Sequence, residues 1–275
     1  MEGQITKILS NLYFVTYKDK VYECHARGKF RHESITPTVG DYVRFDEKNN
    51  YILEVLPRKN TLVRPLVSNI DQGLIVTSLK EPDFSSNLLD KLLLVMEHNS
   101  IVPIICLTKE DLLTGEEKIE FSRYIEYYRG LGYLVLYNTN LDDIKIIFKN
   151  KVTVFTGQTG SGKSTLLNML DDSLNLETNE ISKALGRGKH TTRFVQLINL
   201  FDGKVLDTPG FSMIDLSNMS DEDIRDSFIE FSKYPCKFKD CKHLNERDCA
   251  VKDAVEDGRI LESRYNNYKK FIEKK

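Results

Sequence analysis

A glycine-rich segment near the middle of the chain constrains its fold more than any other feature. Residues 157–164 read Gly-Gln-Thr-Gly-Ser-Gly-Lys-Ser and satisfy the G-x-x-x-x-G-K-[ST] pattern of a phosphate loop. Glycines let backbone N–H groups turn inward on phosphate oxygens. The apolar stretch Val152–Thr156 precedes the loop, and the helical pattern Ser164–Leu170 follows it. We therefore predict a strand–loop–helix unit that binds a nucleoside triphosphate.

Each residue of this loop is a candidate nucleotide contact. In the pattern, Lys163 reaches the terminal phosphates and the Ser164 hydroxyl holds Mg²⁺. The helix N-terminus adds its own attraction for anions. The candidate contacts are Gly157, Gln158, Thr159, Gly160, Ser161, Gly162, Lys163, Ser164 and Thr165.

The residues before the loop alternate between strand-like and helix-like periods. Strands are predicted at 74–78, 102–107 and 133–137, and helices at 87–99, 116–130 and 142–148. Such alternation is typical of a mostly parallel sheet with helices on both faces. The predicted fold class of this part is therefore α/β.

The choice between ATP and GTP depends on a second motif. Thr108, Lys109, Glu110 and Asp111 follow the apolar strand 102–107 and fit [N/T]-K-x-D. A carboxylate at Asp111 accepts from guanine N1–H and N2–H₂, and Lys109 packs on the base. Two charge-assisted hydrogen bonds of about 1.5–3 kcal/mol each give roughly 10²- to 10⁴-fold preference over adenine. The motif therefore favours GTP, although Thr108 replaces the commoner Asn.

The order of the motifs is unusual. Residues 207–210, Asp-Thr-Pro-Gly, fit the D-x-x-G pattern, in which Asp207 serves the metal and the glycine N–H meets the γ-phosphate. The base-reading motif at 108–111 comes before the phosphate loop instead of after D-x-x-G. A parallel sheet tolerates this order if the natural ends are joined and the chain is cut elsewhere. We therefore predict a circularly permuted GTPase domain, with the cut directly behind D-x-x-G.

The first 65 residues have a different pattern. Short alternating runs at 12–17, 20–24 and 40–45 are separated by polar turns, which predicts a small all-β barrel. Residues 27–31, Arg-Gly-Lys-Phe-Arg, interleave cations with an aromatic ring, as RNA backbone contact and base stacking require. A solvated basic turn is the commoner explanation of such a short cluster.

Three of the five cysteines crowd near the C-terminus with a histidine. Cys236, Cys241, His243 and Cys249 supply the four ligands of a closed tetrahedral zinc site. A small third domain with few large apolar residues needs a structural metal or a similar cross-link for stability. Because no ligand position is left open, we expect one structural zinc per chain. Cys24 and Cys106 lie in apolar strands and are predicted to be plain buried residues.

Together these segments resemble the RsgA (YjeQ) family of circularly permuted GTPases over nearly the whole chain. The matching segments are 35–43, 108–111, 157–165, 186–193 (Gly-Arg-Gly-Lys-His-Thr-Thr-Arg), 207–211 and 236–243. The resemblance implies an N-terminal OB-fold β-barrel, a circularly permuted P-loop GTPase domain and a small C-terminal zinc-binding helical domain. We place these domains at 1–65, 66–215 and 216–275. It also implies a role in small ribosomal subunit maturation, with rRNA and GTP/GDP as partners.

Several features of hydrolysis follow from individual residues. The position after D-x-x-G, where many GTPases carry a water-orienting glutamine, holds Phe211, so another group must orient the water. His190 titrates near neutrality and is one candidate; a switch residue that contacts a partner is an equal alternative. Thr191 or Thr192 of the same loop supplies a further ligand to the Mg²⁺ that accompanies GTP. We take His190, Lys163 and Thr192 as catalytic candidates, and Ser164, Thr191 and Asp207 as Mg²⁺ ligands.

Composition limits the remaining classes. The 275 residues carry 39 Lys and Arg against 41 Asp and Glu, which argues against a wholly basic nucleic-acid coat. The longest pure apolar run, Leu92–Met96, is far below the roughly 18 residues of a membrane span, and the N-terminus lacks a signal peptide. We expect a cytoplasmic monomer without a membrane partner. A small-molecule kinase is disfavoured by Asp111, and an RNA-binding module with a vestigial GTP site is disfavoured by the intact Lys163, Ser164 and Asp207.

Overall fold

The computed structural model describes residues 1–28, 30, 35–63, 66–171, 195–207 and 216–273. The chain forms two compact units. The first comprises residues 1–73, 140–155 and 163–211, and the second comprises 74–139, 156–162 and 212–275. Among the described helices, none combines the length and apolarity needed to cross a membrane.

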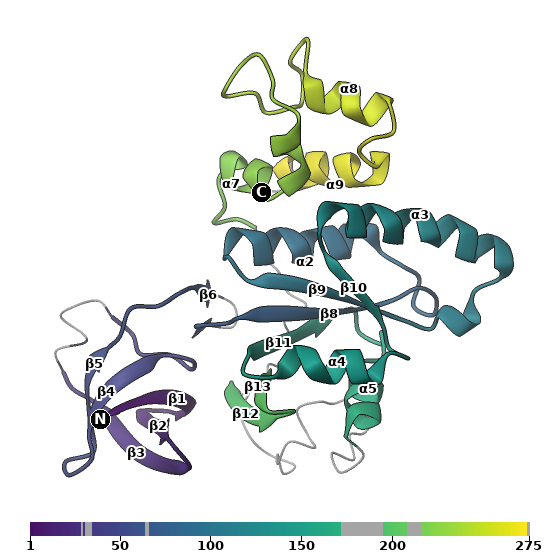
Figure 1. The fold of residues 1–275 in the computed structure, drawn as a ribbon. Coiled ribbons are helices and arrows are strands. Elements are labelled where there is room, and N and C mark those ends of the chain that lie inside the picture. The colour runs from purple at the N-terminus through teal and green to yellow at the C-terminus, as the bar shows by residue number, and fades with distance from the viewer. Residues whose placement is uncertain (29, 31–34, 64–65, 172–194, 208–215, 274–275) are drawn as a thin grey trace. The chain divides into compact units, whose positions relative to one another are not determined.

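The N-terminal part of the first unit is a closed five-stranded barrel (Figure 1), as predicted. Its strands are β1 (Glu2–Leu9), β2 (Leu12–Tyr17), β3 (Lys20–Ala26), β4 (Tyr42–Asp46) and β5 (Tyr51–Val55). β1, β2 and β3 form an antiparallel meander, β3 pairs with β5 in parallel, and β4 closes the ring against both β5 and β1. The short strands β6 (Thr61–Val63) and β7 (Leu66–Ser68) form a separate hairpin.

Alternating inward side chains fill the barrel, including Ile5, Val15, Val43 and Ile52. Phe30 belongs to this core and is only 3% exposed. The sequence interpretation of Phe30 as a base-stacking ring is therefore wrong, because the hydrophobic interior takes the ring away from solvent.

The remainder of the first unit is α/β. It contains α4 (Leu141–Phe148), β11 (Val152–Gly157), α5 (Lys163–Leu170), β12 (Gln196–Leu200) and β13 (Gly203–Asp207). β11 pairs with β13 in parallel, as predicted, whereas β12 pairs antiparallel with both β13 and the barrel strand β1. The sequence analysis did not predict β12.

The second unit contains the strands β8 (Gln72–Ser78), β9 (Val102–Thr108) and β10 (Leu134–Tyr137), in the order β10-β9-β8. Its helices α2 (Ser86–His98) and α3 (Gly115–Leu131) match the predicted helices within one residue at each end. α3 begins with a capping box between Thr114 and Glu117 and ends at Gly132 with φ 103°. Local capping chemistry therefore fixes both ends of this helix.

The C-terminal region of the second unit is helical: α7 (Asp221–Asp226), the 3₁₀ turn η3 (Ile229–Lys233), α8 (Ala250–Glu256) and α9 (Glu262–Glu273). Its core contains the large rings Phe228, Phe231, Tyr268 and Phe271, together with Leu94 of α2. α9 lies alongside α2 (Figure 1). The expectation of few large apolar residues is therefore wrong, because these helices share an aromatic core with α2.

Candidate functional site

The glycines of the phosphate loop are required by its backbone. Gly157 has φ 134°, and a Cβ at this position would lie 1.9 Å from the Val76 carbonyl oxygen on β8. Gly160 and Gly162 also have positive φ, at 79° and 91°. Any larger residue at 157 would push the loop off the strand, so the glycine spacing that identified the loop is also what allows it to form.

The base-reading motif is joined to the phosphate loop by a buried hydrogen bond. The Thr108 hydroxyl donates to the Ser161 carbonyl oxygen at 2.7 Å, and Thr108 is only 2% exposed. Thr108 therefore still ties the two loops together, although it replaces the commoner Asn. Beside it, the Ser161 hydroxyl is buried and has no hydrogen-bond partner among the described residues. A buried orphan hydroxyl costs about 1–3 kcal/mol, which a bound polar ligand relieves.

The turn that carries Asp111 is a 3₁₀ element, η1 (Glu110–Leu112). Lys109 precedes it with φ 61°, and its ammonium donates to the Glu81 carbonyl oxygen. Asp111 is exposed and makes no hydrogen bond or ion pair within the described part of the chain. Its carboxylate is therefore available to a ligand.

Two residues that the sequence analysis missed form an ion pair at the start of α3, just after this turn. The Lys80 ammonium contacts both carboxylate oxygens of Glu117 at 2.9 Å, and Glu117 also accepts from the Thr114 backbone N–H at 2.7 Å. The T-x-x-E spacing of residues 114–117 is a capping-box signal that could have identified Glu117. No sequence signal places Lys80 opposite it, since 37 residues separate the two.

The residues that follow the loop at the start of α5 suit a charged ligand. Burial lowers the pKa of Lys163 to about 8, because desolvation disfavours the ammonium form. Ser164 is 6% exposed, and Thr165 is exposed. A polyphosphate would supply the negative charge that stabilises the ammonium form of Lys163.

Some predicted site residues lie outside the described residues. These are His190, Thr191 and Thr192, with the rest of segment 186–193, and residues 208–211 of the D-x-x-G turn. Asp207 is placed through its backbone, at the end of β13 and opposite Gln196 of β12.

The four predicted metal ligands come together. One donor atom from each of Cys236, Cys241, His243 and Cys249 lies within 4.8 Å of all the others. The sulfur of Cys249 is 3.7 Å from that of Cys236, 3.9 Å from that of Cys241 and 3.3 Å from Nδ1 of His243. A tetrahedral zinc with Zn–S bonds of about 2.3 Å separates its sulfurs by roughly 3.8 Å. The separations fit a metal site and exclude a disulfide, whose S–S bond is about 2.05 Å.

The surrounding helices hold this cluster. The Tyr265 hydroxyl donates to the His243 carbonyl oxygen at 2.6 Å, and Phe231 packs edge-on against the imidazole with ring centroids 5.3 Å apart. His243 itself has φ 57°, a left-handed conformation that turns the chain back toward the sulfurs. Burial also raises the pKa of the Cys241 thiol to about 12. A divalent cation offsets that penalty because it stabilises the thiolate.

The two remaining cysteines are buried, as predicted. Cys24 and Cys106 are both 0% exposed. Burial raises the pKa of the Cys24 thiol to about 11 and that of Cys106 to about 12, so both stay protonated at neutral pH.

Known proteins share this arrangement over the full chain. Residues 55–217 match the model of the family described as RsgA GTPase, and residues 2–52 match that of the RsgA N-terminal domain. The curated protein named small ribosomal subunit biogenesis GTPase RsgA from Bacillus cereus is 48% identical, with 99% of this chain and 96% of that protein covered. Its namesake from Streptococcus pneumoniae is 47% identical, with 99% and 94% covered.

Solved structures agree. YloQ, described as a circularly permuted GTPase, has 39% identity and a TM-score of 0.81, covering 99% of this chain and 93% of that one. YjeQ from Thermotoga maritima has 34% identity and a TM-score of 0.84, covering 99% and 97%. The permuted motif order, the closed barrel and the Cys₃His cluster thus occur in one chain that matches these relatives from end to end, and this chain belongs to the RsgA family of circularly permuted GTPases.

Proposed function

We propose that this protein binds the small ribosomal subunit, assists its late maturation, and hydrolyses GTP to GDP to control its association and release. The relatives' names support the ribosomal role. The observation that carries the nucleotide assignment is the Thr108–Ser161 hydrogen bond, which joins a phosphate loop to a base-reading turn. The proposed GTP contacts are those given by the sequence, residues 108–111 and 157–165.

In the proposed complex, the glycine loop presents its backbone N–H groups to the phosphates. The Lys163 ammonium contacts the terminal phosphates, which stabilise its charged form, and the exposed Asp111 carboxylate accepts from the guanine N–H groups. Lys109, anchored to the Glu81 carbonyl, lies along the base. The donor set Ser164, Thr191 and Asp207 consists of hydroxyls and a carboxylate, the hard oxygens that Mg²⁺ prefers. Mg²⁺ held by these oxygens would neutralise charge on the β- and γ-phosphates.

For the chemical step, we propose Lys163 and Thr192 as the groups that stabilise the transferring phosphoryl, and His190 as the group that orients water. The support for His190 is chemical: Phe211 replaces the usual glutamine, and an imidazole can accept a proton near neutral pH.

For the C-terminal region, we propose one structural zinc per chain, held by Cys236, Cys241, His243 and Cys249. The support is that, within the described part of the chain, these four side chains bring one donor atom each to one place, three of them from buried residues. We further propose domain boundaries at 1–65, 66–215 and 216–275, an rRNA-contacting barrel, a cytoplasmic location and a monomeric state.

The decisive experiment is GTP turnover with and without purified small ribosomal subunits. We expect slow intrinsic turnover that small subunits accelerate and that large subunits leave unchanged. A Lys163→Met variant serves as the control for contaminating GTPases. Turnover that small subunits do not change, in a preparation that binds GTP normally, would overturn the proposed ribosomal role.

A further inference from the structure

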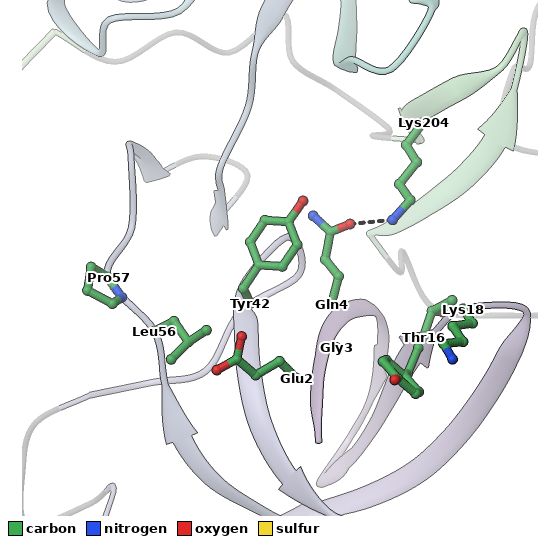
Figure 2. A pocket seen from close by; sticks show the side chains of 10 residues that line it. Glu2, Gly3, Gln4, Thr16, Lys18, Tyr42, Leu56, Pro57 and Lys204 are labelled. Carbon is green, nitrogen blue, oxygen red and sulfur yellow. Dashed lines mark hydrogen bonds between the residues drawn. The ribbon is translucent and has the colours of Figure 1, made fainter.

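A hollow in the first unit lies outside the nucleotide-binding loops. It encloses about 520 Å³ between the barrel strands and β13. Its walls include Gln4 of β1, Tyr42 of β4 and Lys204 of β13, and Figure 2 shows these side chains facing the same space. A second cavity of about 580 Å³ shares Tyr42 and Lys204 as lining residues. Tyr42 and Lys204 therefore line both cavities.

Among the described residues, Lys204 has a hydrogen-bond partner but no counter-ion. Its ammonium donates to the Gln4 amide oxygen, and it forms no ion pair with any described carboxylate. Gln4 is 2% exposed, and its own amide nitrogen donates to the Gly40 carbonyl oxygen at 3.1 Å, so the amide is held in one orientation. Burial lowers the pKa of Lys204. The ammonium is thus fixed in place and partly desolvated, with N–H groups left to donate to a ligand.

The charged residues in the wall of the hollow are two lysines and one glutamate. The acidic wall residue, Glu2, already pairs with Arg44 at 3.0 Å. The other wall lysine, Lys18, lies over the ring of Tyr17 with its ammonium 5.4 Å from the ring centroid. Arg44 is shared with Glu54 at 2.7 Å, so the positive charges that face the hollow without an ion pair to a described carboxylate are those of Lys18 and Lys204.

The hollow also offers an aromatic surface. Tyr42 is 46% exposed, although it is a large ring on a barrel strand. A ring in this setting can stack on a nucleobase while a neighbouring ammonium contacts the phosphate, a pairing that proteins use to bind single-stranded nucleic acid.

We propose that this hollow binds one nucleotide of single-stranded RNA, with its phosphate on Lys204 and its base against Tyr42. The naming of RNA, rather than a free nucleotide, rests on the proposed ribosomal function. Lys204 lies near the start of β13 and Asp207, the proposed metal ligand, at its end. The proposed RNA contact and the proposed metal ligand are therefore three residues apart on one strand.

The test measures binding of a fluorescent single-stranded oligouridine RNA by the full-length protein at several salt concentrations. Lys204→Gln should weaken binding about fivefold and reduce the slope of log K against log[salt] by about 0.7, the value for one phosphate contact on a single strand. Tyr42→Leu should weaken binding roughly 5- to 150-fold, and Tyr42→Phe should restore it. Lys20→Gln, on an exposed barrel lysine outside both cavities, is the matched control and should leave the slope unchanged.

Binding of uridine monophosphate is measured as well, to distinguish a free nucleotide from RNA as the source of the phosphate. Binding of the mononucleotide that depends on Lys204, without RNA binding, would overturn the RNA assignment. Equal effects of Lys204→Gln and Lys20→Gln on RNA binding would also overturn the proposal. If Tyr42→Leu lost small-subunit affinity but bound oligouridine unchanged, the hollow would instead bind a protein partner, and the RNA assignment would be wrong. Thermal unfolding and GTP affinity of each variant confirm that the fold and nucleotide site are intact. Because subunit-stimulated GTP turnover is measured separately in the unaltered protein, failure here leaves the proposed function standing.

Discussion

At the residue scale, the proposed nucleotide site contains groups that suit a polar, charged ligand. Lys163 is partly desolvated, the Ser161 hydroxyl is buried without a described partner, and the Asp111 side chain is exposed and unpaired within the described residues. In the proposed complex, Lys163 contacts the terminal phosphates, Asp111 contacts the guanine edge, and the Ser161 hydroxyl gains a polar partner. GTP binding would then offset the cost of burying the Ser161 hydroxyl in the free protein.

GTP affinity should therefore depend on pH through Lys163. In the free protein its pKa is about 8, lowered by burial, so the ammonium form is lost as pH rises through 8. The bound triphosphate raises that pKa, so binding above pH 8 requires uptake of a proton. We expect GTP affinity to be constant up to about pH 7.5 and then to fall by up to tenfold per pH unit.

Lys163→Arg supplies the control, because arginine stays charged throughout this range. Titration calorimetry between pH 7 and 9 should show a steep loss for the natural protein and a flat profile for the arginine variant. The same slope in both proteins would assign the pH dependence to another group.

Asp111 should determine the base. Asp111→Asn replaces a carboxylate with an amide that cannot accept from both guanine N–H groups, so GTP affinity should fall about 10²-fold or more, with xanthosine triphosphate favoured instead. Competition binding with the two nucleotides measures this exchange. Unchanged GTP affinity would show that the base lies elsewhere.

At the element scale, the C-terminal helices are fixed to α2 by buried charges. Arg264 of α9 is 1% exposed and contacts Asp90 of α2 at 2.7 Å and Glu230 of η3 at 2.5 Å. Asn267 adds a hydrogen bond to the other oxygen of Asp90 at 2.7 Å, and Tyr128 of α3 donates to Asp90 at 2.6 Å. Such a network fixes the register of α9 on α2, because a shift of one residue would leave buried charges unpaired.

Arg264→Met should therefore lower the free energy of unfolding by about 3–5 kcal/mol, since two buried carboxylates lose their counter-ion. Denaturant unfolding measures this change. Adding Asp90→Asn and Glu230→Gln to the same protein removes the uncompensated charges and should recover part of the loss. A loss below about 1 kcal/mol in the single variant would show that the network contributes little.

The metal cluster should stabilise its own loop more than the helices around it. Purified protein should contain about one zinc per chain, and Cys241→Ser should lose most of it. Because Phe228, Tyr268 and Phe271 form a core of their own, we expect hydrogen exchange to increase mainly in residues 236–249, with GTP binding retained. Cys106→Ser is the matched control, and full zinc content in Cys241→Ser would contradict the assignment.

At the scale of the whole molecule, one stretch of the second unit links the nucleotide-binding loops to the C-terminal helices. In segment 79–85, the Glu81 carbonyl accepts from Lys109, and Pro82 lies 3.5 Å from the position of a Cβ on Gly160. α2 begins directly after this segment, and its first residues, Ser86 and Asn87, hydrogen-bond to Asn267 of α9. These contacts form a continuous connection from the predicted GTP-binding loops to α9, and the coupling itself is tested by the next prediction.

Small-subunit affinity should consequently differ between nucleotide states, since a ligand shifts an equilibrium only through differential binding. We expect tight association with a non-hydrolysable GTP analogue and at least tenfold weaker association with GDP, measured by co-sedimentation. Asn267→Ala should reduce this difference, whereas Asn245→Ala, on an exposed residue of the metal-binding loop, should preserve it. Equal affinity in both states would make the protein a GTPase without a switch.

The sequence by itself determined whatever depends on local backbone chemistry and on fixed spacing. The phosphate loop, the permuted order of the motifs, the capping of α3 and the four metal ligands all follow from short segments, because glycine conformations, helix caps and tetrahedral ligation require particular residues at particular positions. The tertiary structure alone decided that Phe30 lies inside the barrel, that Lys80 meets Glu117 and that Arg264 lies between Asp90 and Glu230. It also decided that Lys204 donates to Gln4 and lines the same hollow as Tyr42. The hydrogen bonds and ion pairs among these residues join positions from 34 to 200 apart in the chain. Burial and charge compensation in the folded chain determine these contacts. Neither produces a local sequence pattern, so the contacts could not be predicted from the sequence.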